Sequence, residues 1–145
     1  MNKAIRGIPT DADVRRLLDI SSSSSDRRAI AAVILILSQG LSLTRLNRLS
    51  WANWDLAGRT LIIPSRGGRH AVISLTPLMT RVLASIPRGG KALIFAPLSP
   101  SSPTLAILFT QVLARASLTA FTAADFVSWS TLQSPATRLS TATAY

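Results

Sequence analysis

The chain has 145 residues, which suits a single domain spanning residues 1–145 with a hydrophobic core of its own. It has no cysteine and no glutamate, six aspartates and one histidine, which excludes disulfides and thiolate sites, disfavours two-carboxylate catalysis, and predicts no metal and no cofactor. Fourteen of the 16 basic residues are arginines and the formal net charge is +10, which indicates a polyanionic partner.

The first predicted helix covers about residues 11–20. Thr10, followed three residues later by Asp13, has the spacing of a helix capping box, and apolar residues with helical periodicity come next. Five consecutive serines, residues 21–25, are typical of a flexible connector. We therefore predict a serine-rich loop at this point rather than a domain boundary.

The second predicted helix contains the longest apolar run of the chain, residues 29–37. Ser25 or Asp26 is placed to cap it, and Gly40 suits the position just beyond its end. The run is too short to span a bilayer, which takes about 20 residues, and no apolar stretch precedes Pro9. We therefore predict a buried helix in a cytoplasmic protein that has no membrane segment.

A change from helical to extended pattern follows. A short helix can begin at Ser42 or Thr44, after which segments 54–56, 60–64 and 70–75 are rich in β-branched or aromatic residues. Glycine-containing turns separate these segments. The pattern predicts a three-stranded antiparallel meander.

Further helices are predicted in the second half of the chain, at 77–86, 104–116 and 123–132, with a short strand at 93–95. Residues 133–145 are mostly small and polar, which predicts a loosely held tail. The fold class is therefore mostly α with a small three-stranded antiparallel sheet.

Segment 40–55 resembles the catalytic domain of the tyrosine recombinases, the phage-integrase family. Six residues of this segment fall in register with the family signature without a gap: Gly40, Leu41, Leu46, Leu49, Trp51 and Asp55. The strand at 60–64, the hairpin at 66–69 and the strand that ends at Leu75 follow in the family's order, and the resemblance extends over about residues 9–120. It implies the fold of a recombinase catalytic domain and a role in DNA recombination, integration or transfer.

The resemblance also implies where the catalytic residues should stand. The family attacks a DNA phosphodiester with a tyrosine, stabilises the phosphate with two arginines, and uses a lysine as general acid. Here Ser42 stands at the first arginine, Ala124 and Val127 at the His and Arg of a His-x-x-Arg segment, and Ala136 near the downstream histidine. Arg45 replaces a glutamate. These positions are degenerate.

At two of the family's catalytic positions, the resemblance places a residue with a functional side chain. Arg66 stands at the lysine of the hairpin, and Tyr145 takes the place of the nucleophile if about one helix has been deleted between Val127 and Pro135. Arginine is a poor proton donor near neutral pH, and loss of one stabilising donor costs about 2.7–4 kcal/mol of transition-state stabilisation. The chain is therefore expected to be a pseudoenzyme.

Duplex DNA is the partner that the resemblance and the charge favour together. The residues that we expect to contact it are Arg45, Arg48, Arg59, Arg66, Arg69 and His70. The predicted function is that of a nucleoid-associated accessory or modulator of DNA recombination, which self-associates or joins a partner recombinase. Two alternatives stay open: an active strand transferase that uses Tyr145, and a basic module for an acidic protein partner.

The remaining conspicuous arginines and tryptophans are not assigned a functional role. We interpret Arg27 and Arg28 as a solvated pair, and Trp51 and Trp54 as packing residues rather than base-stacking platforms. The sequence gives no explanation for Trp129 in its polar surroundings.

Overall fold

Six α-helices, one short 3-10 helix (η1) and one antiparallel sheet make up the described part of the chain, so the predicted fold class is confirmed. The structure, a computed structural model, describes residues 7–55, 57, 59–64, 70–88, 90–97, 99–134 and 137. Its elements are α1 (Asp11–Ser22), α2 (Arg27–Gln39), α3 (Leu43–Arg48), η1 (Trp51–Asn53), β1 (Trp54–Asp55), β2 (Thr60–Pro64), β3 (His70–Ser74), α4 (Pro77–Ala84), α5 (Leu105–Arg115) and α6 (Ala123–Leu132).

Local capping signals fix where the first two helices begin and end. The Thr10 hydroxyl accepts a hydrogen bond from the Asp13 amide, and the Asp13 carboxylate accepts one from the Thr10 amide, which is the predicted capping box. The Asp26 carboxylate caps α2 by accepting from the Arg28 amide. Gly40 ends α2 with φ of 68°, a left-handed conformation that glycine adopts without strain.

The prediction of a loop over all five serines, residues 21–25, was wrong for the first two. Helix α1 continues to Ser22. Ser21 is buried, and its hydroxyl donates to the carbonyl of Leu18 one turn earlier, so it needs no water. Residues 23–26 connect α1 to α2, so only the last three serines lie in this loop.

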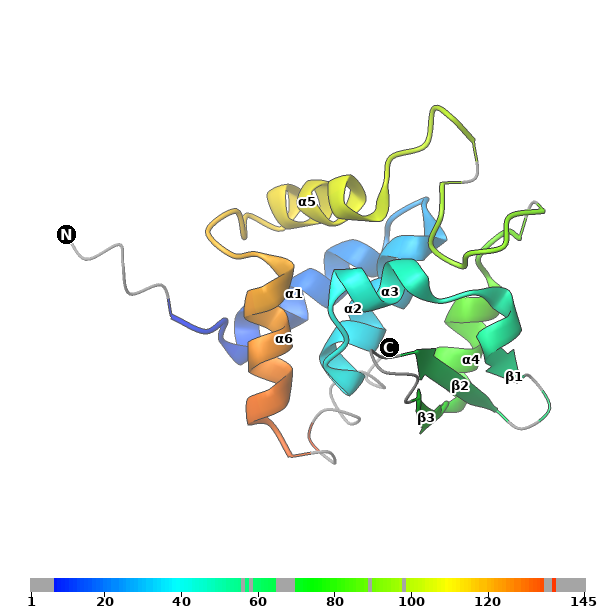
Figure 1. Cartoon of the computed structure of the whole chain (residues 1–145). Helices are drawn as coiled ribbons and strands as arrows, with labels where there is room; N and C mark the ends of the chain where they lie inside the picture. Colours follow the sequence, from blue (N-terminus) through cyan, green and yellow to red (C-terminus); the bar gives the residue numbers. More distant parts are fainter. Residues whose placement is uncertain are drawn as a thin grey trace.

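Helix α2 lies at the centre of the molecule (Figure 1). Every residue from 29 to 37 is buried, which confirms the predicted buried helix. Helices α1, α4, α5 and α6 all pack against it, with α6 on one side and α4 with the sheet on the other in Figure 1. Among the described residues, no helix combines the length and apolarity that crossing a membrane requires.

The sheet has the strand order β1-β2-β3, and both pairings are antiparallel, as the meander predicted. Leu61 and Ile63 of β2 are buried and anchor the sheet to the core, whereas β3 lies at the edge and is largely exposed. The predicted strand at 93–95 was wrong. Only Leu93 pairs there, as an isolated antiparallel bridge to Ser50, because the chain turns again directly afterwards.

Helix α6 belongs to the core and explains Trp129. The Trp129 indole is buried and donates to the carboxylate of Asp11 at 3.3 Å. The hydroxyl of Ser130, also buried, donates to the carbonyl of Leu37 at 2.8 Å. These bonds join α6 to α1 and α2. The predicted loose tail at 133–145 falls mostly outside the described residues.

The interpretation of Arg28 as solvated was wrong. Its residue exposure is 3%, and its guanidinium donates to both oxygens of Asp26 and to the carbonyls of Phe95 and Pro103. Lys91 completes the cluster by donating to two carbonyls of the same loop. Because these partners lie far apart in sequence, Arg28 fastens the loop between α4 and α5 to the start of α2.

The charges in this cluster shift two pKa values. Burial raises the pKa of Asp26, but hydrogen bonds from Arg28, with the charges of Arg28 and Lys91, outweigh it and leave that pKa below its ordinary value. Burial, together with the neighbouring charge of Arg28, lowers the pKa of Lys91. The cluster is thus an ionised pair with a second cation beside it.

Candidate functional site

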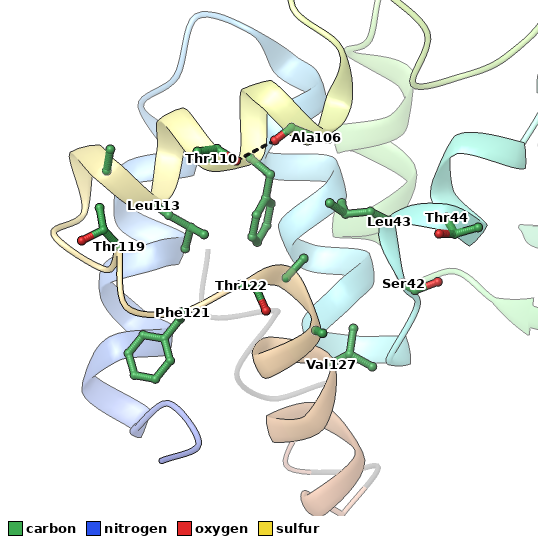
Figure 2. Close-up of a pocket in the computed structure, with 14 residues that line it drawn as sticks. Ser42, Leu43, Thr44, Ala106, Thr110, Leu113, Thr119, Phe121, Thr122 and Val127 are labelled. Atoms are coloured by element: carbon green, nitrogen blue, oxygen red, sulfur yellow. Dashed lines mark hydrogen bonds between the residues drawn. The ribbon is translucent and has the colours of Figure 1, made fainter. Parts of the chain in front are cut away.

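Three of the residues that the family resemblance singled out, distant in sequence, meet in one pocket. Ser42, Ala124 and Val127 all line a cavity of about 590 Å³. Figure 2 shows its walls: the start of α3, helix α5, and the start of α6 with the loop before it. The fold therefore brings together three residues that the sequence comparison had matched to separate family motifs.

Ser42 has a local structural role at this site. It is the N-cap of α3, and its hydroxyl accepts a hydrogen bond from the Arg45 amide at 3.2 Å. Such a cap satisfies an amide that the helix itself leaves unpaired. Ser42, which the resemblance assigns to the family's first arginine, is therefore a neutral helix cap in this structure.

The start of α6 carries the other two positions. The Asp125 carboxylate accepts from the amide and the hydroxyl of Thr122, which confirms Thr122 as the cap of this helix. Ala124 and Val127 lie three residues apart and so share one face of α6, which is the face that lines the pocket. Their side chains are small and neutral, whereas the resemblance assigns a histidine and an arginine to these positions.

Two solved structures have the same fold. The first, described as "Crystal structure of XerA recombinase", matches with a TM-score of 0.68 and 15% identity over 86% of this chain and 48% of that one. The chain has a tyrosine-recombinase-like fold. The second, "Integrase from mycobacterium phage Brujita", matches with a TM-score of 0.61 and 21% identity over 86% of this chain and 44% of that one. The chain thus spans about half the length of these two proteins. No family model and no curated protein matches the sequence.

The pocket of this recombinase-like fold is uncharged throughout its described lining. Phe109, Leu113 and Val127 supply much of its apolar wall, and five residues with hydroxyl groups stand among them. A cleavage site must neutralise the charge that develops on a phosphate, and none of these side chains is a cation. No cluster of potential metal ligands occurs among the described residues either.

The expected DNA-contacting cations fall into separate groups. Arg45 and Arg48 are exposed on α3, three residues apart and so on one face, directly after the pocket residue Thr44. His70 is exposed at the start of β3, opposite the end of β2. Arg59 precedes β2, so the length of that strand, about 13 Å, separates it from His70. The structure therefore does not bring Arg59 and His70 together.

Four further predicted positions, namely Arg66, Arg69, Ala136 and Tyr145, lie outside the described residues. Their assignments as hairpin cations, degenerate histidine and nucleophile stay predictions.

The sequence interpretation missed the α5 wall of the pocket. Ala106 with Thr110, and Phe109 with Leu113, are four residues apart and form one strip of that helix. This spacing was visible in the sequence. What the spacing alone does not show is that the strip faces the starts of α3 and α6.

Proposed function

We propose that this domain binds duplex DNA without cleaving it and acts as an accessory or modulator of DNA recombination, integration or transfer. In this proposal it works in the cytoplasm on the nucleoid, by itself, as a self-associated form, or beside an active recombinase. The observation that carries the proposal is the uncharged pocket at Ser42, Ala124 and Val127, within a recombinase-like fold whose neighbouring surface is cationic.

The lost chemistry follows from the pocket lining. Each missing phosphate-stabilising donor costs about 2.7–4 kcal/mol, which slows a reaction by roughly 10²–10³-fold. Two arginine positions and one histidine position are neutral here. Arg45 lies nearby, but its backbone amide binds Ser42 and its side chain is on the exposed side of α3. Strand cleavage at this pocket is therefore not expected.

DNA binding needs only the exposed cations. Arginines that neutralise phosphates release counterions, so the logarithm of the affinity falls linearly with the logarithm of the salt concentration, by about 0.9 for each phosphate contacted. Arg45 and Arg48 are well placed because they are exposed on one face of α3, the helix whose first residues line the pocket. Arg66 and Arg69 belong to the same proposal as hairpin contacts.

A salt titration of binding to a duplex of unrelated sequence tests this. Replacing Arg45 and Arg48 together with alanine should reduce the slope by about two. The matched control replaces Arg16 and Arg81, exposed arginines on α1 and α4, and removes the same charge. The control should keep the wild-type slope. A wild-type slope in the variant that lacks Arg45 and Arg48 would mean that the DNA-binding face does not include α3.

Two further measurements separate the alternatives. A nicked suicide duplex traps a covalent tyrosyl–DNA adduct, so an adduct at Tyr145 would establish an active strand transferase and contradict the proposal. Competition by unrelated duplex DNA distinguishes the third possibility. An acidic protein partner that survives such competition would point to a protein-interaction module, because phosphate-driven binding would be displaced.

A further inference from the structure

We propose that the pocket at Ser42, Ala124 and Val127 binds a neutral, largely apolar small molecule that carries one hydrogen-bond acceptor. Its volume of about 590 Å³ falls within the range of small-molecule sites, roughly 300–1,000 Å³. This binding goes beyond DNA recognition. It rests only on that part of the proposed function which denies strand cleavage at this pocket.

The walls determine the polarity of the ligand. Phe109 and Leu113 of α5 are buried apart from the surface that they turn to the pocket, and Leu43 and Val127 reach it from α3 and α6 (Figure 2). These apolar walls favour an apolar ligand, because contact with it removes both surfaces from water. The body of the ligand is therefore apolar.

The charge of the lining excludes an ionic ligand. The chain carries a formal charge of +10, yet the described lining holds no charged residue. A charged group placed against these walls would lose part of its hydration without gaining an ion pair, which is unfavourable. A DNA phosphate is disfavoured for the same reason, so the pocket and the cations of α3 serve different ligands.

The hydroxyl groups of the pocket lining determine which polar group the ligand should carry. The Thr110 hydroxyl already donates to the Ala106 carbonyl, the bond drawn in Figure 2, so its proton is engaged. The Ser42 hydroxyl accepts from the Arg45 amide, and a hydroxyl that accepts one bond can still donate its own proton. A carbonyl or ether oxygen at the α3 end of the ligand would accept that proton.

The neutral fluorophore N-phenyl-1-naphthylamine, whose emission rises in apolar surroundings, tests whether the pocket takes an apolar body. The titration uses roughly 1 M NaCl, where the Debye length of about 3 Å suppresses phosphate-driven binding and keeps this test separate from the DNA test. We expect saturable binding with one site per chain. Lack of saturable binding to the wild-type protein would overturn the proposal.

Two variants and a control locate the site. Val127→Arg places a cation in the pocket and should weaken binding by at least about tenfold. Ser128→Arg adds the same charge at the next, exposed position of α6, outside the lining, and should leave the affinity unchanged. Ala124→Phe fills the pocket from an exposed position, and it carries the test if far-ultraviolet circular dichroism shows Val127→Arg to be unfolded. Wild-type affinity in a folded pocket variant would refute the assignment.

Discussion

Replacing Arg28 with methionine tests whether the buried cation cluster holds the fold together. The guanidinium makes four hydrogen bonds, two to the Asp26 carboxylate and one each to the carbonyls of Phe95 and Pro103. Methionine has a comparable length and an apolar stem, so it retains much of the packing. The variant therefore removes the polar partners more than the volume.

The expected loss of folding free energy follows from the Asp26 carboxylate, which stays in place without its partner when Arg28 is replaced. Breaking a buried ion pair from one side costs about 3–5 kcal/mol, because the remaining charge stays uncompensated. The Asp26 side chain is 28% exposed, so water can hydrate it in part, which favours the lower end, about 3 kcal/mol. The total free energy of unfolding of such a domain is about 5–15 kcal/mol, so this loss is a large part of it. The midpoint of thermal unfolding should fall by roughly 6–12 °C.

Urea unfolding, followed by tryptophan fluorescence and circular dichroism, measures this loss. The neighbouring variant Arg27→Met is the matched control, because the only hydrogen bond found for the Arg27 side chain among the described residues is a 3.3 Å bond from its Nε to the Ser85 hydroxyl. The control should change the free energy of unfolding by about 0.5 kcal/mol or less. A loss below about 1 kcal/mol for Arg28→Met, or equal losses in both variants, would refute the reasoning.

Four other substitutions have expected outcomes in the same unfolding assay. The lowered pKa of Asp26 means that its ionised form stabilises the fold above the ordinary value near 4 and loses this effect as the pH falls through the lowered pKa, so Asp26→Asn should flatten the loss of stability below about pH 4. Ser130→Ala leaves the Leu37 carbonyl without its donor and should cost about 1–3 kcal/mol. Gly40→Ala forces a side chain into a left-handed conformation and should cost about 1–2 kcal/mol. Ser42→Ala removes the α3 cap, which should cost about 1 kcal/mol and leave the salt slope of DNA binding unchanged.

The helices were predictable because their signals are local. Thr10, Asp26 and Thr122 cap the helices that the sequence assigned to them, and Gly40 ends α2 as its position indicated. A cap depends on two or three neighbouring residues, so it is visible in the sequence itself. The end of α1 was missed because the burial of Ser21 depends on the tertiary packing around it.

Long-range contacts account for the features that the sequence did not show. Arg27 and Arg28 are identical side by side in the sequence, yet only Arg28 reaches the carbonyls of Phe95 and Pro103. Trp129 likewise finds its partner more than a hundred residues earlier, in α1. Periodicity marks which face of a helix is apolar, but it does not identify the element that covers that face.

Three residues that the family resemblance singled out line one pocket, and their equivalence to catalytic positions stays a prediction. Matching the order of the family motifs placed Ser42, Ala124 and Val127 at equivalent catalytic positions, and the pocket contains all three. Composition alone could not have found them, since serine, alanine and valine carry no distinctive chemistry. The α5 wall, which includes Phe109, stayed hidden because the apolar spacing of a helix does not show which elements it faces.

The residues that hold the fold and the residues expected to bind DNA are different. Ser42 caps α3, and the half-buried Val127 packs against the core, so the neutral residues at these positions support the structure locally. An arginine at Val127 would be partly desolvated there, a cost that an enzyme sustains only for its chemistry. Because Arg45 and Arg48 lie on the exposed side of α3, DNA affinity and folding stability should vary independently across the variants described above.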